Sequence, residues 1–318
     1  MDRQGAVAQV RAAVAQFARD HEADAGPWCV ALSGGADSLA LTVAAAALRP
    51  TVALIVDHGL QPGSDTVAAT ARDQALSVGC VAAQILSVQV GTYGGPEAAA
   101  RIARYDALAG ARDGRPVLLG HTLDDQAETV LLGLGRGSGA RSIAGMRPHD
   151  PPWGRPLLGV RRAVTAAACA EAGLTAWQDP HNADPRYTRV RLRTEVLPLL
   201  EDVLAGGVAE ALARTATALR EDSDTLDEIA DAARAGLDEQ PDVAALASLP
   251  GPIRRRVLRG WLLANGASGL TELHIRAVDA LVTAWRGQGA VAVPSDAPRQ
   301  RLFAGRRDAR LHLYREPV

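Results

Sequence analysis

Short apolar runs alternate with longer segments of helical periodicity through the first half of the chain. The apolar runs have the length of buried strands and occupy residues 28–32, 52–56, 81–88 and 116–120. The segments with apolar residues at helical spacing are 7–17, 39–48, 64–78, 97–111 and 123–134. This alternation predicts an α/β fold, with a parallel five-stranded sheet and helices on both faces. Ligands of such folds bind beyond the carboxyl ends of the strands.

The pattern changes after residue 134. Glycine and proline are dense from 134 to 159, which is typical of a surface loop or a functional insertion. The remaining elements are expected as helices at 161–172, 197–237, 253–263 and 273–285, and as short strands at 290–293 and 300–314. We therefore predict a sheet-containing domain over 1–215. A helical linker and a small, mainly helical C-terminal domain with short strands should occupy 216–318.

Composition narrows the chemistry that the chain can perform. All 34 residues of the Lys+Arg total are arginine, so the chain has no lysine. Schiff-base aldolases, pyridoxal-phosphate enzymes and ligases that form a lysyl-adenylate are therefore excluded. The three cysteines are far apart and form neither a CxxC pair nor a zinc pattern. No apolar run reaches transmembrane length and no signal-peptide core follows the N-terminus, so we expect a cytoplasmic protein without a membrane partner.

The most informative motif joins the first predicted strand to the next helix. It reads Ser33-Gly34-Gly35-Ala36-Asp37-Ser38. The glycines let the backbone approach an anion closely, the serines add hydroxyl donors, and the helix N-terminus supplies N–H groups and a positive dipole end. A Walker A loop would need a lysine, which this chain lacks. The motif therefore predicts a phosphate-binding loop built without lysine.

A second group of polar residues follows the fourth predicted strand, at the start of a helix. At helical spacing, its members fall within one arc of about 100°. They are His121, Asp124, Asp125 and Glu128. One imidazole and three carboxylates on one face are suited to Mg²⁺ or to a relay of protons and hydrogen bonds. The alternative is a solvated helix face whose acids complement the helix dipole.

Polar residues also lie near the other predicted strand ends. Arg101 and Arg104 align with Glu97 on one helical face, so the arginines are placed to hold a triphosphate or an RNA backbone. Tyr105 lies beside them. A surface ion pair between Glu97 and Arg101 would explain the same spacing. The dipeptide Asp57-His58 ends the second strand and is either a nucleotide contact or a turn.

The net charge of −2 hides an uneven distribution. From 136 to 162 the chain carries six arginines and one acidic residue, whereas 201–242 carries twelve acidic residues and three arginines. The stretch 177–193 is also dense in arginines, donors and acceptors. These basic stretches indicate a local anionic partner, bound through phosphate contacts, with solvated loops as the alternative. Arginines within 254–259 and 299–310 suit a phosphate backbone too, unless they pair with the acidic helix.

Taken together and in this order, these segments resemble the PP-loop ATP pyrophosphatase superfamily and, within it, the tRNA(Ile)-lysidine synthase family. The resemblance spans about residues 30–200. Its motifs are 33–38, 56–60, Glu97 with 100–105, 120–121 with 124–129, 134–137, 155–158, and 177–179 with Asn182 and Asp184. Departures from the family pattern are Thr122 for a second histidine, Gln61 for an arginine and Val190 for an asparagine. They leave the resemblance intact and bring into question the hydrogen bonds near Thr122 and Val190.

The resemblance implies a two-step ligation that uses ATP and Mg²⁺. The O2 atom of the wobble cytidine, in the CAU anticodon of tRNA(Ile), attacks the α-phosphate of ATP and expels pyrophosphate. The ε-amine of free L-lysine then displaces AMP at C2 and gives lysidine, which switches the tRNA from methionine to isoleucine specificity. In this scheme 1–215 is the PP-loop ATP-binding catalytic domain, and the small C-terminal domain within 216–318 binds tRNA. The oligomeric state stays open, with a homodimer as one option.

The residue patterns and the resemblance together assign expected roles. The expected catalytic residues are Asp37, Arg101, His121, Asp125 and Glu128, with Asp37 and Asp125 as Mg²⁺ ligands. The expected ATP-binding residues are Ser33, Gly34, Gly35, Ala36, Asp37, Ser38, Asp57 and His58. The expected contacts to tRNA or substrate are Arg104, Tyr105, Asp124, Arg136, Arg141, Arg147, Asp179, Asn182, Arg189, Arg191 and Arg193.

Three other functions fit parts of the pattern. Sulfur-inserting relatives that act on tRNA generally need a cysteine pair, which Cys29, Cys80 and Cys169 do not supply. A PP-loop enzyme that amidates a small molecule, such as an NAD synthetase, stays open, as does an ATP-binding sensor without turnover. Release of pyrophosphate that depends on both tRNA and lysine would separate these functions.

Overall fold

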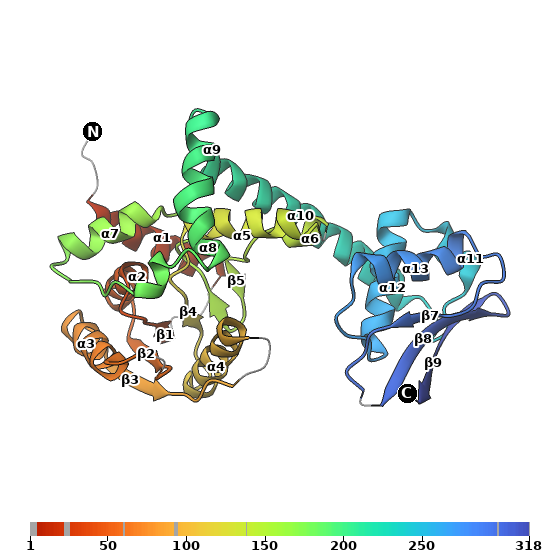
Figure 1. Ribbon diagram of the computed structural model, residues 1–318, viewed down its shortest axis with the longest axis horizontal. Helices are drawn as coiled ribbons and strands as arrows, with labels where there is room; N and C mark the ends of the chain where they lie inside the picture. The colour runs from red at the N-terminus through yellow and green to blue at the C-terminus, as the bar shows by residue number, and fades with distance from the viewer. Residues whose placement is uncertain are drawn as a thin grey trace. The chain divides into compact units, whose positions relative to one another are not determined.

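A computed structural model describes residues 5–21, 26–59, 61–91, 95–137, 139–297 and 299–317 of the chain. The side chains of residues 96, 97, 181 and 182 are outside this description. The chain divides into two compact units (Figure 1). Each has its own hydrophobic core. The first unit comprises Met1–Leu131 and Gly145–Arg214, and the second comprises Leu132–Ala144 and Thr215–Val318.

The first unit is built on a six-stranded sheet. In spatial order its strands are β3 (Ala82–Ser87), β2 (Thr51–Asp57), β1 (Trp28–Ala31), β4 (Val117–Leu118), β6 (Trp153–Gly154) and β5 (His149–Asp150). The first five run parallel, and β5 pairs antiparallel with β6. The predicted parallel sheet is thus confirmed, with one antiparallel strand added at its edge.

Strands β5 and β6 lie in the stretch 134–159, where the sequence predicted only a loop or an insertion. Each has two residues, which is too few to produce a periodic pattern. Main-chain pairing with β4 defines β6, because the N–H groups of Val117 and Leu119 donate to the carbonyls of Pro152 and Gly154, both at 2.8 Å. Tertiary pairing therefore forms this edge of the sheet, and local propensity does not.

Helices cover both faces of the sheet, as predicted (Figure 1). They are α1 (Ala6–His21), α2 (Ala36–Ala46), α3 (Ser64–Ser77), α4 (Pro96–Ala111) and α7 (Arg162–Glu171). Alternate residues of β1 belong to opposite layers: Trp28 and Val30 pack in the core that includes α1, α2 and α3, whereas Cys29 packs with Leu108 of α4. Strands buried on both faces explain the continuous apolar runs in the sequence.

The rest of the first unit is mainly helical. Its further elements are η1 (Pro180–Ala183), α8 (Thr188–Arg191), the π-helical turn η2 (Leu192–Val196) and α9 (Leu197–Val203). Helices α5 (Leu123–Arg136) and α10 (Val208–Ala235) begin in the first unit and extend into the second, and α6 (Ala140–Ile143) belongs to the second. The helix predicted for 197–237 is interrupted, because Gly206 and Gly207 have φ of +91° and +76°. Glu201 accepts hydrogen bonds from the N–H groups of Val208 and Ala209, at 3.0 and 3.1 Å, and so caps α10.

The second unit packs helices against a small antiparallel sheet. Its further elements are α11 (Val243–Ser248), α12 (Gly251–Ala264), α13 (Glu272–Thr283), β7 (Val291–Val293), β8 (Gln300–Arg307) and β9 (Arg310–Pro317). The strand order is β7-β8-β9. The core joins Leu302 and Leu311 of the sheet to Leu258 of α12 and Val278 of α13. The mainly helical region with short strands is therefore confirmed. Among the described helices, none combines the length and low polarity needed to cross a membrane.

Candidate active site

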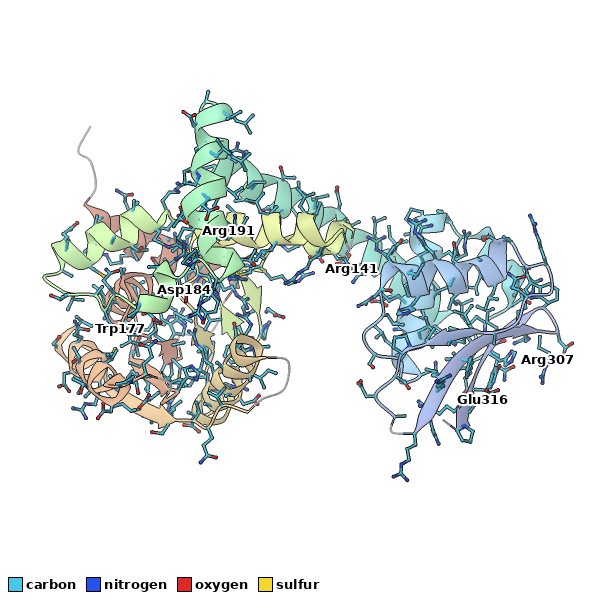
Figure 2. All side chains as sticks on the ribbon, in the orientation of Figure 1. Arg141, Trp177, Asp184, Arg191, Arg307 and Glu316 are labelled. Atoms are coloured by element: carbon cyan, nitrogen blue, oxygen red, sulfur yellow. The ribbon has the colours of Figure 1, made fainter. Side chains whose placement is uncertain are left out.

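The phosphate-binding motif forms the turn between β1 and α2. Gly34 has a φ of +83°, which favours glycine, and its carbonyl accepts the N–H of Trp177 at 2.9 Å (Figure 2). Ser38 Oγ donates to the carbonyl of Gly35 at 2.9 Å and lies 3.1 Å from Ser33 Oγ. Among the described residues, no side chain caps the start of α2. The N–H groups of its first turn are therefore available to an anion.

The end of β4 lies directly against this turn. A Cβ atom on Gly120 would come within 3.0 Å of Ser38 N and 3.1 Å of the Asp37 carbonyl group. Only glycine permits this approach, because the atoms that a side chain would meet belong to the backbone. The contact brings the two motifs, residues 33–38 and 120–129, into one site.

Arg162, the first residue of α7, lies among the predicted carboxylates. Its guanidinium donates to Asp125 Oδ1 at 2.6 Å, to Glu128 Oε1 at 3.4 Å and to Asp37 Oδ2 at 3.5 Å. Its main-chain N–H donates to Asp124 Oδ2 at 2.7 Å. One arginine is thus shared by all four acidic residues, and the sequence had indicated it only as part of a basic stretch.

The proton affinity of these carboxylates depends on burial and on their partners. Burial raises the pKa of Asp37, although a hydrogen bond from the Thr165 hydroxyl and the charge of Arg162 oppose the rise. Burial acts to raise the pKa of Asp125 as well. Here the charge of Arg162 and two hydrogen bonds from Thr122, both at 2.8 Å, outweigh burial and hold the pKa below its usual value. Asp125 is therefore an anion at neutral pH.

Glu128 is the most deeply buried member of the cluster, with a side chain that is 0% exposed. It accepts two hydrogen bonds from Arg193, from Nε at 2.8 Å and from Nη2 at 3.3 Å. This bidentate geometry is the strong form of a carboxylate–guanidinium pair. Arg193 lies in the π-helical turn η2, and such turns are frequent at functional sites. We refer to Asp37, Asp124, Asp125, Glu128, Arg162 and Arg193 as the carboxylate cluster.

Two histidines at strand ends keep a ring nitrogen without a partner. The Nδ1 atoms of His58 and His121 are buried and accept or donate no hydrogen bond within the described part of the chain. Burial lowers the pKa of His121 to about 4, helped by nearby arginines and opposed by Asp125. Burial and the charge of Arg104 lower the pKa of His58 as well. Both imidazoles are therefore neutral at pH 7, with one nitrogen free for a ligand.

Arginines surround these histidines. Arg155 is buried and donates from Nη1 to the carbonyl of Arg147 at 2.9 Å, whereas its buried Nε has no partner among the described residues. Arg101 is exposed, and its guanidinium lies 4.9 Å from the ring centroid of Tyr105. Arg104 is half-buried and acts on both imidazoles. A buried guanidinium nitrogen without a partner, whose charge acts on His121 at the end of β4, fits a polyphosphate ligand such as ATP.

A cavity of about 130 Å³ adjoins the carboxylate cluster. Its charged lining consists of Asp124, Glu128, Glu201, Arg161, Arg162 and Arg193. Leu197 and Pro198 of α9 contribute apolar surface. Equal numbers of carboxylates and guanidinium groups suit a small ligand that carries both charges, such as an amino acid.

Magnesium was expected on Asp37 and Asp125. Across the described residues, no three His, Cys, Asp or Glu side chains are grouped to hold a metal ion. Mg²⁺ that accompanies a nucleotide needs only one or two carboxylates, because phosphate oxygens supply further ligands. Asp37 fits this arrangement, since it lies in the first turn of α2 beside the loop. Both expected ligands already accept hydrogen bonds at both carboxylate oxygens, Asp125 from Thr122 and Arg162 and Asp37 from Thr165 and Arg162, so either would exchange a hydrogen-bond partner for the metal.

Several expected tRNA contacts already pair with a carboxylate. Arg191 pairs with Glu195 on the surface at 2.9 Å (Figure 2). Arg141 of α6 pairs with Asp227 of α10, and Arg256 of α12 pairs with the same carboxylate at 2.8 Å. For Arg256 this pairing with the acidic helix is the alternative that the sequence left open, whereas for Arg141 the sequence did not indicate it.

The other predicted residues lie near the surface or outside the description. Those that are exposed or half-buried include Arg136, Arg147 and Arg189. Asp179 accepts a hydrogen bond from Gln61 at 3.2 Å. Asp57 accepts the N–H of Gly59 at 2.9 Å, as in the turn that was the alternative reading of this position. The side chains of Glu97 and Asn182 are outside the described residues.

The sequence-based prediction missed the central role of Arg162 and the contact of Thr165. One signal was present, because Arg161 and Arg162 open a helix, where the helix dipole disfavours cations. Arginines at such a position require carboxylate partners, which Asp124 and Asp125 supply. At residue 122 the main-chain N–H donates to Asp125 as that of a histidine could, and the threonine hydroxyl adds a second hydrogen bond to the same oxygen.

Comparisons with known proteins agree with this geometry. The PP-loop domain matches residues 7–200, and the TilS substrate binding domain matches residues 242–312. The chain is 71% identical, over 100% of both chains, to tRNA(Ile)-lysidine synthases of Mycolicibacterium paratuberculosis and Mycobacterium tuberculosis. The enzyme of that name from Mycobacterium leprae is 65% identical, with the same coverage. A solved U34-tRNA thiolase, NcsA from Methanococcus maripaludis, shares the fold with a TM-score of 0.56 and 17% identity, over 68% of this chain and 80% of that one.

Proposed function

Because the chain belongs to the tRNA(Ile)-lysidine synthase family, we propose that it is an ATP-dependent ligase that joins L-lysine to C2 of the wobble cytidine in the CAU anticodon of tRNA(Ile). The observation that carries the proposal is the junction of two sites in the first unit. A phosphate-binding loop at 33–38 meets the carboxylate cluster through Gly120. One side of the junction is suited to ATP and the other to a charged amine.

We assign adenylation to the loop side of the junction. The first N–H groups of α2 and the Ser33 hydroxyl bind the departing pyrophosphate. Arg101 and the unpartnered Nε of Arg155, whose charges both act on His121, are suited to stabilise charge on the phosphoryl oxygens. Mg²⁺ held by Asp37 and phosphate oxygens would neutralise charge as pyrophosphate departs. His121 is neutral at pH 7, so it orients the reacting groups through hydrogen bonds without adding charge.

We assign the lysine substrate to the 130 Å³ cavity. Its arginines can bind the α-carboxylate of the amino acid, and its carboxylates can bind the ammonium groups. Asp125 is ionised at neutral pH and holds Arg162, which lines the cavity, at 2.6 Å. The carboxylates of Asp124 and Glu128 line the cavity themselves and are placed to accept a proton from the attacking amine. The amine would then displace AMP from the adenylated cytidine, which gives lysidine and changes the tRNA from methionine to isoleucine specificity.

We propose that the second unit positions the tRNA and takes no part in adenylation. The match of residues 242–312 to the TilS substrate binding domain supports this role. So does the basic character of its sheet, where residues 299–315 carry six arginines and one acid. The domain boundary at 215, the homodimer and the cytoplasmic location stay predictions that accompany the proposal.

Mass spectrometry of the tRNA product tests the proposal. We expect tRNA(Ile) incubated with the protein, ATP, Mg²⁺ and lysine to gain one lysine on the wobble cytidine. Without lysine, an AMP adduct should accumulate on the same nucleotide after a single release of pyrophosphate, so that sustained release requires both tRNA and lysine. A transcript with a CAU-to-GAU change, which lacks the target cytidine, is the control. Pyrophosphate release that is equally fast without tRNA would contradict the proposal and favour a small-molecule amidating enzyme.

A further inference from the structure

The sheet of the second unit has one face in the core and one face directed away from it. Leu302, Ala304 and Leu311 belong to the core. Side chains alternate along a strand, so the neighbours of these residues lie on the other face. The strand register pairs Phe303 with Tyr314 and Gly305 with His312 on that face. We call these four residues the outer sheet face.

Three aromatic rings form a continuous stack on the outer sheet face. The rings of Phe303 and Tyr314 have centroids 5.4 Å apart and an interplanar angle of 17°. The rings of His312 and Tyr314 follow at 5.7 Å and 19°. A Cβ atom on Gly305 would lie 2.9 Å from the His312 ring, so glycine is what allows this imidazole to lie over β8. Stacked rings on a sheet surface form a platform for further planar groups.

A cavity of about 320 Å³ lies at the end of the stack. It is lined by His312, Tyr314, Gly305, Arg306, Arg307 and the segment 288–290. The guanidinium of Arg306 lies over the Trp285 ring, 4.7 Å from its centroid. Arg307 is exposed, and within the described part of the chain it forms no ion pair (Figure 2). Nδ1 of His312 is buried and lacks a partner among the same residues.

We propose that this cavity binds one unstacked nucleotide of an RNA strand. Its base would stack on the rings of Tyr314 and His312, and its phosphate would contact Arg307. Bases splayed out of a loop, bulge or end stack on aromatic side chains in this way, and arginines track the adjoining backbone. The surrounding segment, with six arginines and one acid in 299–315, complements a polyanion.

The proposal rests on tRNA being the substrate and adds a base contact to the phosphate contacts expected of this unit. It predicts that the unit distinguishes an unpaired nucleotide from a continuous duplex, because the rings can reach only a base whose face is free. Phosphate contacts alone would give no such preference.

Binding of full-length variants to RNA tests the proposal. Tyr314→Leu removes the ring but keeps apolar bulk, Tyr314→Phe keeps the ring, and Leu273→Ala is a control at a side chain that is 75% exposed on α13. The probes are fluorescently labelled hexauridine, a blunt-ended RNA duplex and tRNA(Ile). Their binding to each variant is measured by fluorescence anisotropy at several salt concentrations. Tyr314→Leu should weaken binding of hexauridine and tRNA about 5- to 100-fold. Tyr314→Phe and Leu273→Ala should bind as the unmodified chain does.

Salt dependence separates stacking from charge. Tyr314→Leu should leave the slope of log K against log salt unchanged, whereas Arg307→Ala should reduce it by about one. Duplex binding should not respond to Tyr314→Leu. Equal affinities of Tyr314→Leu and the unmodified chain for hexauridine would overturn the proposal, as would a loss that is the same for duplex and single strand.

Failure of this proposal can be told from failure of the proposed function. Tyr314→Leu should raise the KM for tRNA by the factor found in binding and leave kcat unchanged, since no residue of the carboxylate cluster is altered. If the unmodified chain adds lysine to tRNA but Tyr314→Leu has an unchanged KM, the proposed nucleotide site is wrong and the proposed function stands. If Tyr314→Leu loses hexauridine binding but the unmodified chain adds no lysine, the pocket stands and the function fails.

Discussion

Replacing Arg162 with glutamine would test how far the carboxylate cluster depends on its shared cation. The Arg162 side chain is 25% exposed, and its partners Asp125 and Glu128 are 14% and 0% exposed. Glutamine keeps much of the side-chain volume and can still donate hydrogen bonds, but it removes the charge. The carboxylates would then stay partly buried with less positive charge beside them. Removing one partner of a buried ion pair destabilises a fold strongly, because it leaves the other charge buried and uncompensated.

The expected loss of stability depends on the positive charge that remains beside the carboxylates. Removing one partner of a fully buried pair costs about 3–5 kcal/mol. Arg193 stays 2.8 Å from Glu128 and 3.8 Å from Asp125, so part of the compensation is kept. Allowing for this and for the partial exposure of Arg162, we expect the free energy of unfolding of the first unit to fall by about 2–4 kcal/mol at pH 7.

The loss should depend on pH in a defined direction. In the folded chain the pKa of Asp125 lies below its usual value. Burial raises this pKa, and the charge of Arg162 is the largest of the effects that lower it. A carboxyl group of this kind stabilises the fold above its unfolded pKa of about 4 and ceases to do so as the pH falls through the folded pKa. The stability deficit of Arg162→Gln should therefore be complete at pH 7 and shrink below about pH 4, as Asp125 becomes protonated.

Urea unfolding followed by circular dichroism, at pH 7 and at about pH 3, measures this difference. Arg186→Gln is a matched control, because Arg186 also forms a short pair with an acid, Asp184, but its side chain is 83% exposed. We expect its unfolding midpoint to equal that of the unmodified chain. Equal midpoints for Arg162→Gln and the unmodified chain at pH 7 would refute the idea that Arg162 compensates the cluster.

Three further predictions follow from the site. Gly120→Ala should raise the KM for ATP and lower the free energy of unfolding by about 1–3 kcal/mol, because its methyl group would meet the backbone at Ser38; an unchanged KM would show that the loop does not bind ATP. Asp37→Asn should abolish pyrophosphate release yet unfold at the same or a higher urea concentration, since burial disfavours the charge there; normal release by the folded variant would contradict its assignment. His121 should titrate near pH 4 by NMR, so its neutral form contributes stability that is lost as the pH falls from about 6.5 towards 4; a midpoint near 6.5 would show that the imidazole is not buried.

The loop and the first helices could be predicted because their signals are local. Residues 33–38 contain their own glycines, hydroxyl groups and helix start, so the turn between β1 and α2 needs little from the rest of the chain. The same holds for the apolar runs of β1 and β2, which are long enough to show the pattern of strands buried on both faces. The acidic residues after β4 were also correctly placed on the start of α5.

Tertiary contacts decided what the basic residues do. Arg193 was expected to contact tRNA, but its guanidinium lies on Glu128, 65 positions away in the chain. Arg162 belongs to a stretch whose composition indicates nucleic acid, and the fold places it on Asp37, 125 positions away. A guanidinium has the same charge whether it binds a phosphate or a carboxylate, so composition cannot distinguish the two partners.

The sequence by itself therefore determined the order of strands and helices, the phosphate-binding loop and the residue types available for chemistry. Only the tertiary structure decided which arginines are already paired, that β5 and β6 complete the sheet, and that Phe303, His312 and Tyr314 share one face. The physical reason is the range of the interactions. Backbone propensity and periodicity act over a few neighbouring residues, whereas strand pairing, ion pairing and ring stacking depend on which distant segments the folded chain brings together.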